Sequence, residues 1–146
     1  MDNAQENKYI TSAIVLTSFA SPLLFGSLNI ALPTMAQELA MNAIQMGWVT
    51  SVFALTGAIL ILPFGRLADI SGRKKIFILG ILIYISAIAV TAFSISAYML
   101  IALTLVQGIG FSMVVTSSTA IVSSAYPPQQ RGKIFGMTAS AVYSSL

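Results

Sequence analysis

Few residues of this chain could carry out chemistry. Its 146 residues include no cysteine and no histidine, and only seven Lys or Arg and four Asp or Glu. The missing Cys and His exclude thiol nucleophiles, zinc sites of the Cys/His type and imidazole acid–base catalysis. We therefore expect no enzyme activity, no metal site and no cofactor.

The charged residues gather in one segment, G-R-L-A-D-I-S-G-R-K-K, at residues 65–75. It holds four of the seven basic residues and one of the four acids. Gly65 and Gly72 flank the segment, and we expect a turn of about ten residues there, because glycine permits a tight path. Its basic residues suit anionic headgroups and the cytoplasmic side of a membrane. Neither property explains Asp69, because an acid adds little to topology and weakens attraction to anionic lipid.

The elements on either side of this segment are apolar. The chain is 57% hydrophobic and 8% charged, whereas soluble domains carry roughly 25% charged residues. Stretches near the ~20 residues needed to cross a bilayer predict an all-α, polytopic transmembrane helix bundle. The four expected spans lie at about 10–32, 46–64, 76–95 and 98–125, and part of a fifth lies at 133–146.

The positive charges predict the orientation. The connection between the second and third stretches and the one holding Arg131 and Lys133 are basic, whereas the connection at 34–45 carries only Glu38. Positive residues favour the cytoplasmic side, so the N-terminus is expected to be cytoplasmic in a multi-pass protein of the cell membrane. A net charge of +3 in such a chain is a topology signal, and we expect no nucleic-acid partner.

The segment at 65–75 resembles the signature loop of the major facilitator superfamily, which lies between the second and third helices of those transporters. The matching residues are Gly65, Leu67, Ala68, Asp69, Gly72, Arg73, Lys74 and Lys75. Other stretches resemble the multidrug and fourteen-span drug/proton antiporter branch of the family. They are "LNIALPTM" at 28–35, "GWV" at 47–49, "LTLVQGIG" at 103–110 and "RGKIFGM" at 131–137.

The resemblance implies a secondary transporter that moves small solutes, with drug or metabolite efflux the favoured activity. It implies that the segment at 65–75 is a conformational latch, meaning a breakable contact between two six-helix halves. The residues expected to form it are Gly65, Asp69, Gly72, Arg73 and Lys74. A carboxylate at a helix end can meet a guanidinium or a helix N-terminus. The local alternative for Asp69 is capping or an ion pair with Arg73.

The resemblance is incomplete at two intramembrane positions. Leu24 and Thr104 stand where many drug/proton antiporters carry an aspartate and an arginine. Ionisable residues inside the membrane are the usual proton relays. Protons remain a candidate coupling partner. The aspartate and arginine that commonly serve drug/proton antiporters in the first four helices are, however, replaced here.

Neutral polar groups could line a substrate cavity instead. Ser18, Phe25 and Asn29 share one face of the first helix, and Thr104 and Gln107 share one face of the fourth. The alternative for these residues is interhelical hydrogen bonding. Gly108 and Ser112, four residues apart, are expected to be helix-packing positions, because small residues let helix backbones approach.

The predicted helices amount to an incomplete N-terminal half of the major facilitator fold. A transporter of that fold needs two halves that move against each other, so we expect an N-terminal fragment that needs the missing C-terminal helices of a parent protein. Two alternatives remain open. One is a small four-helix exporter that acts as a dimer, and the other is a non-transporting membrane remnant or assembly protein.

Overall fold

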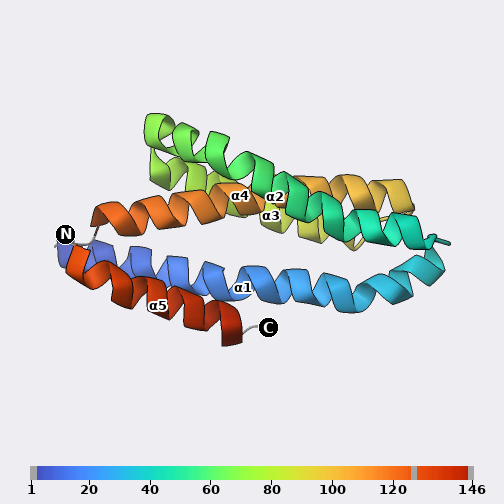
Figure 1. Ribbon diagram of the computed structural model, residues 1–146, viewed down its shortest axis with the longest axis horizontal. Helices are drawn as coiled ribbons and strands as arrows, with labels where there is room; N and C mark the ends of the chain where they lie inside the picture. The colour runs from blue at the N-terminus through green and yellow to red at the C-terminus, as the bar shows by residue number, and fades with distance from the viewer. Residues whose placement is uncertain (1–2, 126–127, 145–146) are drawn as a thin grey trace. The chain divides into compact units, whose positions relative to one another are not determined.

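The computed structural model describes residues 3–125 and 128–144, and leaves undescribed some side chains near the two ends, including that of Ser18. Every element in this part of the chain is a helix (Figure 1). The helices are α1 (Asn3–Glu38), α2 (Ala43–Ser71), α3 (Arg73–Thr91), α4 (Ala97–Ala125) and α5 (Pro128–Ser144). The predicted all-α fold class is therefore confirmed.

Three of these helices are long and apolar enough to cross a membrane, within the residues described. They are α2, α3 and α4 as far as Ser124. At 1.5 Å of rise per residue, the 19 residues of α3 span about 28 Å, close to a hydrocarbon thickness of ~30 Å. The first span and the partial fifth span remain predictions from hydropathy.

The helices differ from the apolar stretches at their ends. α2 continues to Ser71, beyond the expected end at residue 64, and α3 begins at Arg73 instead of residue 76. A helix need not stop where the hydrocarbon stops, because its backbone hydrogen bonds continue in the interfacial region. α5 begins at Pro128 instead of residue 133, since proline is favoured in the first turn, where its missing N–H costs nothing.

The connection between α1 and α2 is short and fully capped. Ala40 has a φ of 48°, and the N–H of Met41 donates to the carbonyl of Ala36 at 2.8 Å, which is the Schellman end of a helix. Asn42 and Gln45 then form a capping box at the start of α2, with bonds of 2.8 and 3.0 Å. Both helix ends at this connection are therefore hydrogen-bonded.

The chain divides into two compact units. One comprises α1 up to Ile30 together with the chain from Thr119 onward, and the other runs from Ala31 to Ser118. The second unit contains α2, α3 and most of α4.

Glycines bring α4 close to α2 and α3 in the second unit. A Cβ added to Gly108 would lie 3.0 Å from the carbonyl oxygen of Phe53 in α2. A Cβ added to Gly110 would lie 2.7 Å from the backbone nitrogen of Tyr84 in α3. The backbones therefore approach so closely that only glycine fits at these two positions.

An aromatic cluster fills the centre of the same unit. The ring of Phe111 in α4 lies 5.2 Å from that of Phe53 and 6.4 Å from that of Tyr84, measured between ring centroids. Both pairs are tilted, an arrangement that aromatic rings favour. The cluster joins α2, α3 and α4 at one level.

Candidate functional site

The α2–α3 corner, defined as residues 65–75, turns on a single residue. Gly72 has a φ of 98° and a ψ of 121°, a conformation that side-chain-bearing residues rarely adopt. Its N–H donates to the carbonyl of Ala68 at 3.1 Å and ends α2. Its carbonyl accepts from the N–H groups of Lys75 and Ile76, at 3.1 and 3.2 Å, and begins α3.

The expected turn of about ten residues is therefore one residue long. Gly65 lies inside α2, where an added Cβ would lie 4.0 Å from the nearest atom, Cγ2 of Thr116 in α4. Its role in the turn is a correction to the prediction, because hydropathy marks where the apolar run ends and not where the helix ends. Gly72 alone reverses the chain.

An ion pair bridges the turn. Nη2 and Nε of Arg73 donate to Oδ1 of Asp69 at 2.8 and 3.0 Å. The side chain of Asp69 is 59% exposed and that of Arg73 is 36% exposed. Exposed pairs contribute ~0.2 to 1 kcal/mol, so this contact could be exchanged for another one. This ion pair is the local alternative for Asp69 that the sequence allowed in addition to a role in the latch.

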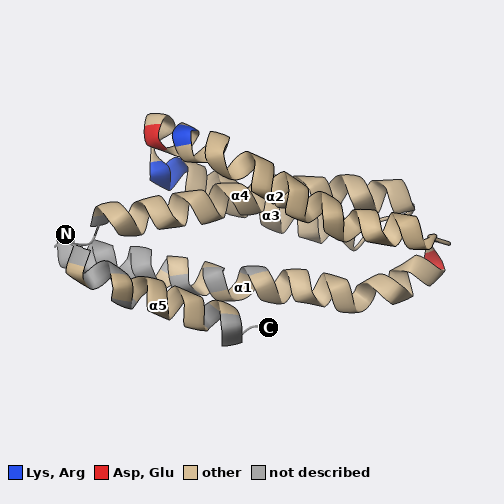
Figure 2. Ribbon diagram, in the orientation of Figure 1, with Lys and Arg blue, Asp and Glu red and all other residues tan. Residues whose placement is uncertain are grey.

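The corner rests on a small apolar core. Ala68 is completely buried, in a cluster with Ile76 of α3 and Met113 of α4. Phe64, Ile83 and Ile109 pack around that cluster. The helix ends that carry the charged residues are thus packed on a buried cluster that includes residues of α3 and α4. Figure 2 shows the charged residues together where α2 meets α3.

Two of the candidate cavity residues on α4 are engaged within the protein. Gln107 is buried, and its Nε2 donates to Oγ1 of Thr91 in α3 at 2.9 Å. Thr91 in turn donates to the carbonyl of Ala87 at 2.8 Å. Thr104 is fully buried and donates to the carbonyl of Leu100 at 2.8 Å. The contact made by Gln107 is the interhelical hydrogen bond that the sequence offered as the alternative to substrate binding.

Sequence reasoning did not single out Thr91. The available signal was chemical, because a glutamine amide inside a membrane helix requires a partner on a neighbouring helix. Which partner it finds depends on the rotation and height of α3 against α4, and neither is encoded in a local pattern.

The candidate residues on α1 lie in the other compact unit. Asn29 is half-buried, and its Nδ2 donates to the carbonyl of Phe25 one turn earlier, at 2.9 Å. The side chain of Ser18 lies outside the described residues. A cavity shared by these residues with Thr104 and Gln107 remains a prediction.

The two predicted packing positions lie within the second unit. A Cβ added to Gly108 would lie 2.8 Å from Cβ of Thr56 in α2, in addition to its close approach to Phe53. Ser112 is fully buried, and its hydroxyl donates to the carbonyl of Ile109 at 2.8 Å. In the described part of the chain no three His, Cys, Asp or Glu side chains come together in a way that could hold a metal ion.

Comparison with known proteins decides the family. The sequence profile of the Major Facilitator Superfamily matches residues 14–144. The chain belongs to the Major Facilitator Superfamily. Members of this superfamily move small molecules across membranes, so the expected transporter family and multi-pass membrane class are confirmed.

Three relatives show the kinds of transporter that resemble this superfamily member. A methylenomycin A resistance protein of Bacillus subtilis is 35% identical over 94% of this chain and 31% of its own length. The riboflavin transporter RibZ of Clostridioides difficile is 31% identical over 94% of this chain and 30% of its own length. The multidrug transporter protein MdtP of B. subtilis is 24% identical over 94% and 26%. The chain spans less than a third of the length of these relatives.

Proposed function

We propose that the chain forms the N-terminal part of a secondary transporter that exports small molecules, drugs or metabolites, by alternating access. The observation that carries the proposal is the α2–α3 corner, where Gly72 reverses the chain and Asp69 pairs with Arg73. Superfamily membership supports alternating access over a small dimeric exporter. The names of the resistance and multidrug relatives favour efflux.

In this proposal the corner acts as the latch. Asp69 and Arg73 are held together by an exposed contact of small free energy, so a partner on the missing C-terminal helices could replace it. Lys74 follows Arg73 at the start of α3, and the buried cluster of Ala68, Ile76 and Met113 packs under the helix ends that carry these charges. A contact that forms and breaks during each cycle must be weak, and this one is.

The substrate path is proposed to pass the polar faces of α1 and α4. Ser18, Phe25 and Asn29 would contribute from α1, and Thr104 and Gln107 from α4. The two amide side chains among these candidates bond to protein atoms: Asn29 to its own helix and Gln107 to Thr91. Substrate could therefore bind at either position only by exchanging one of these hydrogen bonds. Coupling to protons would require residues other than the intramembrane aspartate and arginine whose positions Leu24 and Thr104 occupy.

The corner is proposed to lie on the cytoplasmic side of the cell membrane, with the N-terminus on the same side. A reporter fused after Lys75 should behave as cytoplasmic, and one fused after Met41 as external. The opposite pattern would refute the orientation inferred from the positive charges.

The activity is tested in a chimera. The segment of the B. subtilis methylenomycin A resistance protein that matches this chain is replaced by this chain, and resistance to methylenomycin A is measured in cells that lack the native gene. The chimera should confer resistance, whereas the relative without its matching segment should not. A chimera that reaches the membrane in normal amounts and gives no protection would argue against the proposed function.

A further inference from the structure

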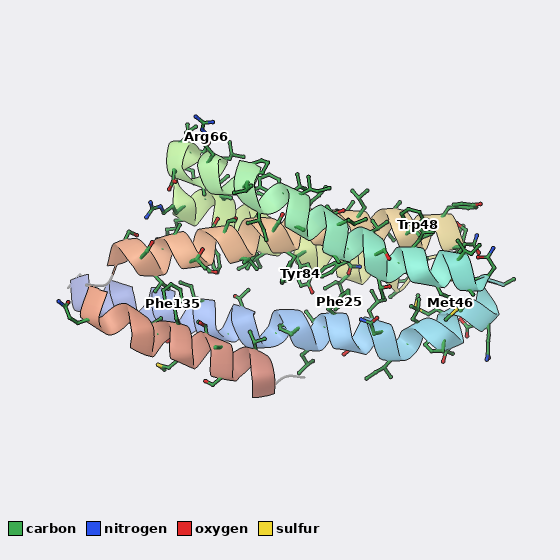
Figure 3. All side chains as sticks on the ribbon, in the orientation of Figure 1. Phe25, Met46, Trp48, Arg66, Tyr84 and Phe135 are labelled. Atoms are coloured by element: carbon green, nitrogen blue, oxygen red, sulfur yellow. The ribbon has the colours of Figure 1, made fainter. Side chains whose placement is uncertain are left out.

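One face of α2 combines apolar and cationic side chains. Ile59 and Leu62 are 67% and 82% exposed. Leu62 follows Ile59 by three residues and Arg66 follows Leu62 by four, so all three lie on one stripe of the helix. Leu55, 53% exposed, extends this stripe away from the corner. Figure 3 shows the side chain of Arg66 extending outward from α2, away from α3 and α4.

The stripe has the length of one membrane leaflet. Leu55 and Arg66 are eleven residues apart, which is about 16 Å along a helix at 1.5 Å per residue. Half of a ~30 Å hydrocarbon core is about 15 Å. An acyl chain that lies along Leu55, Ile59 and Leu62 would therefore place its headgroup at the level of Arg66.

The charge at that level is positive. The corner carries Arg66, Arg73, Lys74 and Lys75 against the single acid Asp69, and Asp69 is already paired with Arg73. Arg66 and Lys75 are exposed, and neither pairs with a carboxylate among the described residues. Next to them Ile70 is 78% exposed, an apolar side chain that suits the boundary between headgroups and acyl chains.

We propose that this surface docks an anionic phospholipid, whose phosphate lies beside Arg66 and whose acyl chain lies along Leu55, Ile59 and Leu62. Charge complementarity and the leaflet-length stripe argue for this occupant together, since a free phosphate would leave the apolar stripe unused. A zwitterionic lipid would leave the cations without a net negative partner. The proposal rests on membrane insertion and does not depend on transport activity.

The binding is tested by native mass spectrometry of the purified chain in detergent, titrated with dioleoyl phosphatidylglycerol or dioleoyl phosphatidylcholine. The chain should bind phosphatidylglycerol at least fivefold more tightly, because each cation near a membrane surface attracts anionic lipid by an amount equivalent to about fivefold in affinity. Arg66→Gln should weaken that binding about fivefold, and Arg66→Lys should retain most of it. Equal affinity for the two lipids would overturn the proposal.

Controls separate this surface from general charge attraction and from phosphate binding. Arg131→Gln removes the same charge elsewhere in the chain and should change the affinity less than twofold, whereas an equal loss would contradict a specific surface. Leu62→Asn, which keeps every cation, should weaken binding of the lipid but is not expected to affect helicity measured by circular dichroism. Displacement of the lipid by millimolar inorganic phosphate would show a phosphate site instead and overturn the lipid assignment.

A second measurement tests whether other helices cover the stripe. The chimera with the B. subtilis relative is titrated with the same two lipids. Retained preference for phosphatidylglycerol supports the proposal, and a preference lost in the chimera but present in the isolated chain would mean that helices of the complete transporter occupy the surface.

Discussion

The two glycines of the α2–α3 corner should respond in opposite directions to the same substitution. Gly72 has a φ of 98° and no atom within 4 Å of an added Cβ, so Gly72→Ala introduces backbone strain without a steric clash. Gly65 lies inside α2 and has only Cγ2 of Thr116 near an added Cβ, at 4.0 Å. Gly65→Ala therefore adds a good helix former without strain.

The magnitudes follow from the backbone conformations. A non-glycine residue in a sparsely populated region costs about 1 to 3 kcal/mol, so Gly72→Ala should destabilise the protein by that amount. Alanine in a helix interior is favoured over glycine by about 0.8 to 1 kcal/mol, so Gly65→Ala should be neutral or stabilising. The two variants should differ by about 1 to 4 kcal/mol, which is at least about a factor of 5 in the unfolding equilibrium constant.

The assay is unfolding of the purified protein in mixed micelles by sodium dodecyl sulfate, followed by far-ultraviolet circular dichroism. The fluorescence of Trp48, the one tryptophan in the sequence, provides a second probe. A Gly72→Ala variant as stable as Gly65→Ala would refute the inference that Gly72 alone reverses the chain.

Three further perturbations test the packing and capping. Gly110→Ala should destabilise the protein by about 1 to 3 kcal/mol, because the three atoms nearest to its Cβ would be backbone atoms. Gly57→Ala, whose Cβ would have its nearest atom at 3.8 Å, should not destabilise it. Equal melting temperatures of the two variants would contradict the close approach of α4 to α3. Gln107→Leu and Thr91→Val should each destabilise, and a double-mutant cycle should give a coupling of about 0.6 to 2 kcal/mol; additive losses would mean that the two side chains do not interact. Ala40→Gly should stabilise by up to about 1 kcal/mol because Ala40 has a positive φ, and a lower unfolding midpoint would contradict the Schellman end of α1.

The sequence predicted the class of fold because its signal is strong and local. A run such as residues 76–91 must be helical in lipid, since each unpaired backbone group there would cost several kcal/mol. The ends of α2 and α3 were less predictable. Residues 66–71 are polar enough to end an apolar run, but their backbone continues the helix and Ala68 is buried at its end.

The site was predictable where its contacts are local. Asp69 and Arg73 are four residues apart, a spacing that brings side chains together on a helix, and their pairing was one of two alternatives. The pairing of Gln107 with Thr91 joins residues sixteen positions apart, so it depends on how α3 packs against α4. Gly110 is similar, because its sequence context does not reveal that Tyr84 lies against it.

The most direct test of the proposed function removes the charge of Asp69 in the chimera with the B. subtilis relative. Transport per molecule of Asp69→Asn is compared with that of Glu38→Gln, which removes an exposed carboxylate at the last residue of α1. A latch contact of about 0.3 to 1 kcal/mol predicts a loss of about two- to fivefold for Asp69→Asn at equal amounts in the membrane, and no change for Glu38→Gln. Transport that falls only in proportion to the amount of protein, or that does not fall, would contradict the latch.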